Sequence, residues 1–427
     1  MSARVLGALL AVSVVLNALG SGYSLSLAEV IRPWRFVVLA LAAAVALPVV
    51  ARAPRRFGRA LTPFHVGLAA LAVLALSSVG WSINEHKSLG RATALVILLA
   101  VTVAVAVVVR SQGDAIRVIE GIGAGIAVVV AASFVLLVVD RHATVQPGFE
   151  DRDGGALARF RGLTENPDTI GSYGVIGVPL MLGLALAATG RRRVVWGVAA
   201  SAVAAATIAS GSRAATAIAF LQTLALLAPS LRRRARIVGA VACLAGLAVV
   251  LVAVLLPHVF ARAVRPGSFA GLGGRTQAWQ GALHLIGQRP FHGYGFGAEE
   301  FAFSAYRDAH PVEYTHIVLQ GGFVHESYLG LAVQLGIFGA ALGAALLLIP
   351  LVALCRRTRL ERIWRLSLGA GLTGALLNGL FSSSLFSVGN VLTPSVWVIA
   401  AIPFALLGDL REQEKTESSC GKALAHQ

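Results

Sequence analysis

The sequence predicts an all-α protein that crosses a membrane many times. Apolar residues make up 57% of its 427 positions even before its 46 glycines are counted, and charged residues make up only 13%. Soluble domains are about 45–50% apolar with Gly included and about 25% charged. A soluble chain could not bury that much apolar surface, and a disordered chain would not carry it.

Twelve apolar segments account for most of the chain, and each is close to the ~20 residues needed to cross a bilayer once. They are 5–20, 34–51, 62–80, 92–109, 117–139, 169–189, 194–210, 214–230, 237–256, 323–350, 366–386 and 391–408. The alternative for the first segment is a signal peptide cleaved near Ala18-Leu19-Gly20, and we expect a retained helix.

The distribution of charge predicts the topology. With a cytoplasmic N-terminus, 22 of the 36 Lys and Arg residues fall inside with seven of the 20 acids, so the inside carries +15 of the net +16. Both termini are then cytoplasmic, and two long segments, 140–168 and 257–322, lie outside. We expect one transmembrane domain over 1–408, including a helical extracytoplasmic loop at 257–322, and a polar cytoplasmic tail over 409–427.

Several other functions are excluded by pattern. The basic residues cluster between apolar runs and form no basic face, which argues against nucleic acid as a partner. The ten histidines lack metal-ligand spacing. Asp151-Arg152-Asp153 resembles the DxD of nucleotide-sugar transferases, but it falls outside, where nucleotide sugars are not available. We therefore expect no metal and no cofactor.

Arg275 follows Gly273-Gly274 at the expected start of a helix, where free N–H groups and the helix dipole favour an anion. A tight aromatic loop rich in glycine follows, over 288–297. The alternative is an amphipathic helix on the bilayer surface, with Arg275 contacting lipid headgroups.

Arg213 and His325 are two further candidates at the predicted outer face. Charges in or beside spans are costly and mark functional sites, although Arg213 could instead extend its side chain to the headgroups. His325, at the outer end of the tenth span, could act as a base near neutral pH or simply bond at the interface. Glu326 would point about 100° around the helix, which makes it a poor candidate for orienting His325.

Arg213, Arg275 and His325 indicate a functional site more strongly together than any of them does alone. Two arginines suit a diphosphate, and a histidine suits a hydroxyl that must lose a proton. The competing outer bases are Glu299, Glu300, Asp308 and Glu313. Asn166-Pro167-Asp168 is typical of a helix cap.

At these positions the sequence resembles the O-antigen ligase and polymerase family of bacterial envelope biogenesis. The matching residues are Arg161-Gly162-Leu163, Asn166-Pro167, Gly211-Ser212-Arg213, Arg275, Trp279, Pro290, Gly293-Tyr294-Gly295-Phe296-Gly297, His325, Tyr328-Leu329, Leu335-Gly336 and Gly339. The family usually has Asn where this chain has Asp168 and Glu326, and Glu where it has Gln334.

The resemblance implies a metal-independent, inverting glycosyltransferase of the membrane-embedded, GT-C-like kind. Its donor is a glycan on polyprenyl (undecaprenyl) diphosphate at the outer face of the cytoplasmic membrane, and its acceptor is a glycan or glycolipid. By the same resemblance, Arg213 and Arg275 hold the diphosphate and His325 is the base. Candidate supporting residues are Trp279, Tyr294, Glu299 and Glu300.

Two alternatives stay open. A related enzyme could transfer the glycan to protein, as a protein O-oligosaccharyltransferase does. A transporter of small solutes or lipid-linked sugars is the alternative from another class. It should show inverted repeats and broken helices with charge at the membrane midplane, and the sequence shows neither clearly.

Overall fold

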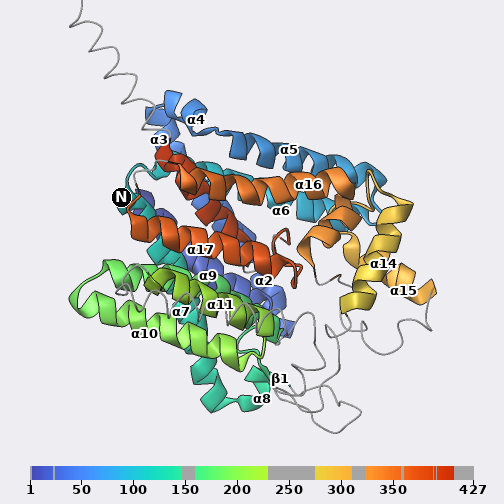
Figure 1. The fold of residues 1–427 in the computed structure, drawn as a ribbon. Coiled ribbons are helices and arrows are strands. Elements are labelled where there is room, and N and C mark those ends of the chain that lie inside the picture. Colours follow the sequence, from blue (N-terminus) through green and yellow to red (C-terminus); the bar gives the residue numbers. More distant parts are fainter. Residues whose placement is uncertain are drawn as a thin grey trace, which may run out of the picture.

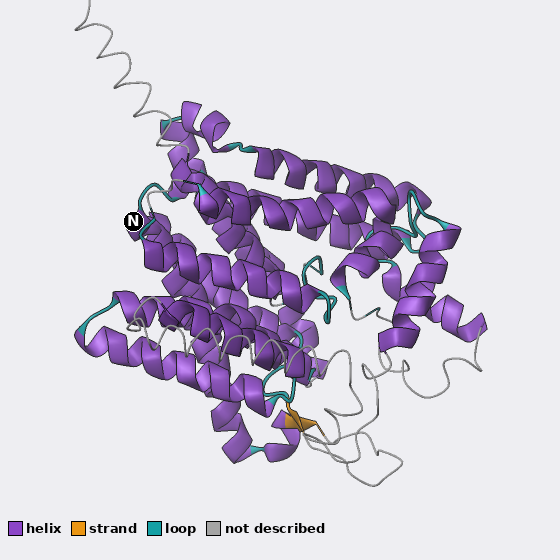
Figure 2. Cartoon of the chain, viewed as in Figure 1, coloured by secondary structure: helices purple, strands orange, loops and turns teal. Residues whose placement is uncertain are grey.

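The computed structural model describes residues 2–22, 25–146, 159–228, 275–309, 324, 326–356, 360–387, 389–390 and 392–407. Within these ranges the protein is a bundle of long helices (Figures 1 and 2). The strands β1 (Val145–Gln146) and β2 (Arg159–Phe160) form one short antiparallel pair, Val145 opposite Phe160.

The first half of the bundle is built from apolar helices that pack in pairs. α1 packs on α7 and α2, and α6 packs on α2 and α5. The elements are α1 (Ser2–Gly20), α2 (Leu25–Ala44), α3 (Leu47–Arg52), α4 (Arg55–Ala60), α5 (Pro63–Ser77), the 3₁₀ turn η1 (Ser78–Trp81), α6 (Glu85–Val108), α7 (Gln112–Val139) and α8 (Arg141–Thr144).

The second half is arranged around α9, which packs on α7, α10, α11 and α17. Its elements are α9 (Pro167–Ala187), α10 (Gly190–Ala209), α11 (Arg213–Leu227), α14 (Arg275–Gln288), α15 (Glu299–Ala309), α16 (Ser327–Cys355), α17 (Arg362–Gly379) and the helix Leu392–Leu407. Small residues let α9 approach its neighbours closely. A Cβ on Gly174, for example, would stand 2.0 Å from Oγ1 of Thr207 on α10.

Eight described helices are long and apolar enough to cross a membrane. α11 and Leu392–Leu407 are shorter apolar helices. Large apolar side chains also remain exposed on the bundle, such as Val138 on α7 and Phe338 on α16. The prediction of an all-α polytopic membrane protein is confirmed, although the number of twelve spans is not. The expected span 237–256 and the tail 409–427 lie outside the described residues.

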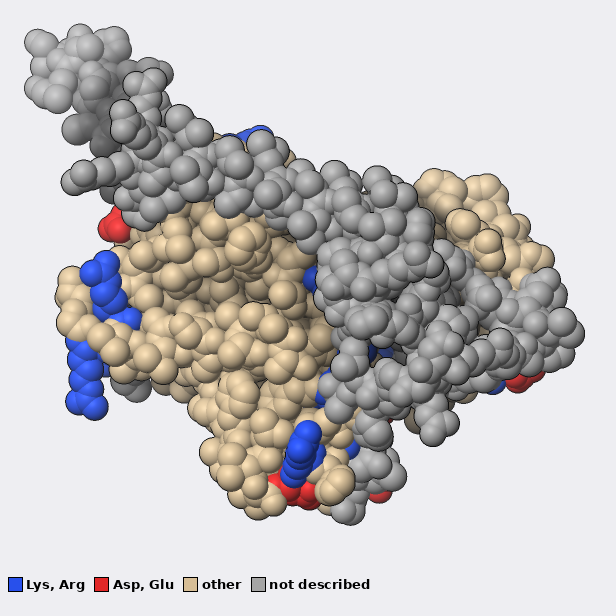
Figure 3. All heavy atoms as spheres, turned by 60° about the horizontal axis from the view of Figure 1, so that its bottom comes forward, with Lys and Arg blue, Asp and Glu red and all other residues tan. Residues whose placement is uncertain are grey.

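The long helices run between two ends of the molecule. α14 and α15 lie at one end, and α3, α4 and the N-terminus lie at the other (Figure 1). We call these the pocket end and the N-terminal end. On the face shown in Figure 3, Lys and Arg side chains stand out at the left edge, and a broad surface free of blue and red adjoins them. Such a surface suits contact with lipid tails.

Three helix boundaries differ from the expected spans in a way that matters for the site. α6 begins at Glu85 instead of residue 92, which places Arg91 inside the helix. α16 begins at Ser327 instead of 323, and α17 ends at Gly379 instead of 386. The residues released from α17 include Ser382-Ser383-Ser384. Serine side chains compete with the helix for backbone hydrogen bonds, which favours a loop there.

Candidate functional site

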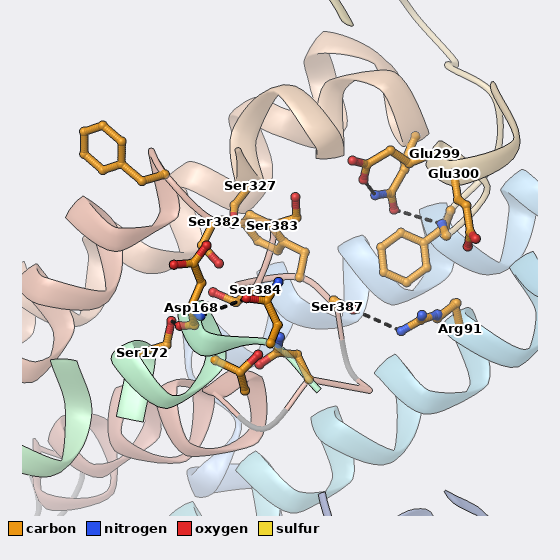
Figure 4. Close-up of a pocket in the computed structure, with 18 residues that line it drawn as sticks. Arg91, Asp168, Ser172, Glu299, Glu300, Ser327, Ser382, Ser383, Ser384 and Ser387 are labelled. Atoms are coloured by element: carbon orange, nitrogen blue, oxygen red, sulfur yellow. Dashed lines mark hydrogen bonds between the residues drawn. The ribbon is translucent and has the colours of Figure 1, made fainter. Parts of the chain in front are cut away.

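A polar cavity of about 180 Å³ opens at the pocket end (Figure 4). It is bounded by α6, the start of α9, the loop before α15, α16, and the loop that follows α17. Its lining is Arg91, Asn166, Asp168, Thr169, Ser172, Phe296, Gly297, Glu299, Glu300, Ser327, Gln334, Phe381, Ser382, Ser383, Ser384, Phe386, Ser387 and Asn390. Segments far apart in the sequence therefore meet in one site.

The start of α9 forms one wall of the cavity. Asn166 caps this helix, its Oδ1 accepting from the Asp168 N–H at 2.9 Å, with Pro167 as first helical residue. The cap predicted from Asn-Pro-Asp is confirmed. Asp168 also pairs with Arg159, Nη2 to Oδ1 2.6 Å, and Nε of Arg159 donates to the Ser210 carbonyl at 2.8 Å. The capped helix is thereby tied to the α10–α11 turn.

Arg213 is the first residue of α11, directly after that turn. The turn lies against α9, because a Cβ on Gly171 would stand 2.7 Å from Cβ of Ser212. Arg213 is half-buried. The structure thus places this predicted diphosphate ligand beside the helix whose N-terminus lines the cavity.

The glycine loop over 290–297 forms the opposite wall by docking onto a break in α16. Gly336 has φ 73°, which interrupts the helix, and Ile337 N donates to the Pro290 carbonyl at 2.8 Å. The Val333 and Gln334 carbonyls accept from Tyr294 N and Gly295 N, both at 2.9 Å. The loop therefore satisfies the backbone groups that the break releases.

Tyr294 serves this docking and does not face the cavity. Its hydroxyl donates to Oε1 of Gln288 at 2.7 Å, and Cζ of Arg289 lies 4.7 Å from the ring centroid. Burial raises the pKa of Tyr294, and the Arg289 charge opposes that rise. Its observed contacts are structural, so the supporting role predicted for it is indirect.

Glu299 is a buried carboxylate at the cavity wall, with 4% of its surface exposed. Its Oε1 accepts from the Val324 N–H at 2.8 Å, and its Oε2 accepts from Nε2 of Gln334 at 2.8 Å. Burial raises its pKa to about 6, and these two hydrogen bonds oppose the rise. Glu299 thus holds the residue immediately before His325.

Glu326 fixes the residue on the other side of His325. It is the N-cap of α16, with extended φ/ψ, and its carboxylate accepts from Tyr328 N and Leu329 N. The expectation that Glu326 lies on a helix was wrong, because the helix starts one residue later. Its carboxylate is nevertheless committed to the cap, and burial raises its pKa. His325 itself lies outside the described residues.

The remaining predicted residues are only partly brought together. Arg275 starts α14 as expected, but its side chain is not described. Trp279 packs in a small core of α14, α15 and α16 residues, and its Nε1 has no partner among the described residues. Glu300 lines the cavity and lies 3.7 Å from Nζ of Lys87, Oε2 to nitrogen.

Sequence reasoning missed the loop after α17 and two arginines. Within the described ranges, Oγ of Ser383 and Oγ of Ser384 are buried without a hydrogen-bond partner. Arg91 on α6 lines the cavity beside Ser387, and Arg35 on α2 lies next to Arg91 (Figure 4 labels Arg91 and Ser387). The available signal was a charge within an apolar helix, since Arg35 lies in the middle of α2 and Arg91 in the second turn of α6.

In the part of the chain that the structure describes, no three His, Cys, Asp or Glu side chains lie together as metal ligands would. The Asp151–Asp153 segment is outside these ranges. Metal independence therefore stays a prediction.

Comparison with known proteins bears on this arrangement directly. Residues 198–344 match the family model described as O-antigen ligase. No curated protein shows significant similarity to the chain. The matched range runs from α10 through the glycine loop over 290–297 to α16, and it contains Arg213, Arg275, Glu299 and His325. The match confirms the resemblance drawn from the motifs and supports a function of the ligase or polymerase type, since residues 198–344 are similar to the O-antigen ligase family.

Proposed function

We propose that the protein transfers a glycan from a polyprenyl (undecaprenyl) diphosphate carrier to a surface-polysaccharide or glycolipid acceptor. The reaction takes place at the outer face of the bacterial cytoplasmic membrane. The observation that carries the proposal is the family match over 198–344, because it spans every residue of the predicted catalytic set. The polar cavity at the pocket end supports it, since serine hydroxyls and amides suit a sugar.

In the proposed reaction, the acceptor hydroxyl attacks the anomeric carbon opposite the leaving diphosphate, which inverts that centre. His325 takes the hydroxyl proton as the new bond forms. Arg213 and Arg275 balance the charge that develops on the departing diphosphate, so no metal is required. A diphosphate needs charge neutralisation and no proton in order to leave.

The contribution of Arg213 is the sharpest test of this chemistry. Arg213→Ala should lower turnover by about 10²–10³, the usual cost of one lost electrostatic contact. Arg213→Lys should retain more activity than Ala but less than wild type, because Lys keeps the charge and loses the bidentate fork. The measurement is release of polyprenyl diphosphate by purified protein given a lipid-linked glycan and acceptor. Wild-type turnover in a folded Arg213→Ala variant would remove this role.

The proposed orientation places the pocket end outside. Single cysteines introduced by Glu300→Cys and Glu361→Cys in a cysteine-free background mark the two ends of the bundle, and Glu361 is exposed. An impermeant thiol reagent should label position 300 in intact cells and leave position 361 unmodified. The reverse pattern would reject both the topology and an outward-facing site.

The acceptor separates the related enzymes that share these motifs. A deletion strain of a polymerase would leave single repeat units, whereas a deletion strain of a ligase would leave long chains on the lipid carrier. Transfer to a protein instead would identify a protein O-oligosaccharyltransferase.

Transport is less well supported than transfer. The break in α16 at Gly336 is a feature that transporters share. In this protein, however, the Val333 and Gln334 carbonyls at the break accept hydrogen bonds from the glycine loop over 290–297. These carbonyls are therefore already engaged and are poorly placed to bind an ion. The break serves to anchor the cavity wall.

A further inference from the structure

Two arginines from different helices converge behind the loop that closes the cavity. Nη1 of Arg35 on α2 donates to the Gly389 carbonyl at 2.8 Å, and Nη1 of Arg91 on α6 donates to Oγ of Ser387 at 3.0 Å. A Cβ on Gly389 would stand 3.0 Å from Nη2 of Arg35 and 3.0 Å from Nη1 of Arg91. These two nitrogens are therefore no more than about 6 Å apart.

The local charge is not balanced at Arg35. The charged groups that act most strongly on it are Arg91 and Arg32, both cations. Its Nε is buried and has no hydrogen-bond partner among the described residues. Both α2 and α6 belong to helices apolar enough to span the membrane. Adjacent cations at such a place are costly unless an anion joins them.

Carboxylates near Arg91 are already engaged elsewhere. Glu299 and Glu300 are its electrostatic neighbours. Glu299 uses both oxygens on Val324 and Gln334, and Glu300 lies beside Lys87. Among the described residues, neither carboxylate forms an ion pair with the Arg91 guanidinium, so the pair of arginines keeps net positive charge.

One member of the pair, Arg91, faces an accessible, polar space. Arg91 lines the cavity, and Gly297 leaves room for its stem, since a Cβ there would stand 2.4 Å from Cγ of Arg91. Ser383 and Ser384 line the same cavity with buried hydroxyls that have no described partner. Guanidinium and hydroxyl donors together suit an oxygen-rich anion.

We propose that Arg91, reinforced by Arg35, forms a phosphate-type oxyanion subsite in this cavity. Neither arginine, nor the 381–390 loop, lies in the matched range 198–344, so the subsite is additional to the predicted donor ligands Arg213 and Arg275. The proposal rests on the proposed function only for the source of the anion. That source is either the diphosphate of the donor or an anionic group on the acceptor.

The direct test is calorimetric titration of the full-length protein in nanodiscs with inorganic pyrophosphate. Arg35→Gln and Arg91→Gln should each weaken affinity about ten- to a hundredfold, because each removes a charge-assisted hydrogen-bond donor or its supporting charge. Arg32→Gln is the matched control, because it removes a cation one turn away from Arg35 on α2. It should change the pyrophosphate affinity less than about threefold, which is well below the loss of one charge-assisted hydrogen bond. Arg91→Lys retains the charge if Gln impairs folding, and should lose less affinity than Gln.

Repeating the titrations in an Arg213→Ala background distinguishes the sources. If one donor diphosphate bridges both sites, the losses from Arg91→Gln and Arg213→Ala will be non-additive, and polyprenyl diphosphate will compete with pyrophosphate. If the anion belongs to the acceptor, the losses will add and pyrophosphate will still bind in saturating polyprenyl diphosphate. Either result supports the subsite.

Unchanged pyrophosphate affinity in folded Arg35→Gln and Arg91→Gln would overturn the proposal, as would an equal loss in Arg32→Gln. These outcomes do not depend on catalysis. Failure of glycan transfer with intact pyrophosphate binding would instead count against the proposed function and leave the subsite in place.

Discussion

The two ends of the bundle each carry a hollow lined with charged residues, but the charges are used differently. At the pocket end, Glu299 is buried, and both of its oxygens accept hydrogen bonds from other segments. At the N-terminal end, a broader hollow between α1, α7 and α10 is lined by Arg4, Arg117, Glu120 and Arg192. There Arg192 pairs with Glu120 while 71% of the Arg192 side chain stays exposed.

Burial explains the difference in consequence. A carboxylate removed from water must be held by specific donors, so it fixes the segments that supply them. A pair in contact with solvent gains little and constrains little. The pocket end should therefore respond strongly to single substitutions, and the N-terminal end weakly. Four predictions test this contrast, from the largest effect to the smallest.

The largest effect is expected for His325→Ala. Glu299 holds Val324 and Glu326 caps α16, so both chain neighbours of His325 are anchored at the cavity. A positioned base contributes about 10²–10⁴ in rate, and turnover of lipid-linked donor should fall by that factor. Donor binding should persist, because the proposed diphosphate ligands Arg213 and Arg275 are unchanged in this variant.

Acidic variants provide the comparison for His325. Glu299, Glu300, Asp308 and Glu313 are the other groups of the predicted outer face that could take the proton. Turnover and donor binding are measured for each one in parallel with His325→Ala. A normal rate for His325→Ala, together with an inactive acidic variant that still binds donor, would transfer the role of base to that carboxylate.

An intermediate effect is expected for Glu299→Gln. The carbonyl of a glutamine can still accept from Val324 N, but its NH₂ would face Nε2 of Gln334, whose Oε1 already accepts from Gly297 N at 2.8 Å. The segment before His325 should loosen, which misplaces the proposed base. We expect turnover to fall by roughly 10–10² with little change in donor affinity.

The pH dependence of stability identifies the same carboxyl. The pKa of Glu299 in the folded protein, about 6, lies above the ordinary 4.5. The stabilisation that the protonated Glu299 carboxyl gives the folded state is therefore fully present below about pH 4.5 and is lost as the pH rises through about 6. Relative to Glu299→Gln, the free energy of unfolding of the wild type should fall by about 2 kcal/mol across this window. Thermal unfolding from pH 4 to 7.5 measures the difference, with Glu300→Gln as the neighbouring control. A constant difference across the window would contradict the assignment.

The fold was predictable where the signal is local. Apolar runs identified the helices, and Asn166-Pro167-Asp168 identified the start of α9. The end of α17 was not predicted, because Phe381 and Phe386 continue the apolar pattern on both sides of three serines. The break at Gly336 was also missed. It depends on Pro290 and Tyr294, which contact α16 only after the chain has folded.

The site divides in the same way. Arg213 and His325 stand in short motifs at the ends of apolar segments, and Arg275 follows a pair of glycines at a helix start, so a pattern of residues could indicate them. Arg35 and Arg91 are 56 positions apart and have no shared motif. Only the packing of α2 on α6 brings them together, and each taken singly looked like one more charge at the end of a span.

The smallest effect is expected at the N-terminal end, for Arg192→Ala and Glu120→Ala. These side chains form an ion pair between α10 and α7, and its exposure lets water and salt screen the attraction. Each substitution should change the free energy of unfolding by less than about 1 kcal/mol and leave glycan transfer unchanged. Denaturant unfolding of both single variants and the double variant at low and high salt measures the pair. A loss of transfer, or a coupling that salt does not reduce, would show that the hollow at this end is also functional and would remove the contrast between the two ends.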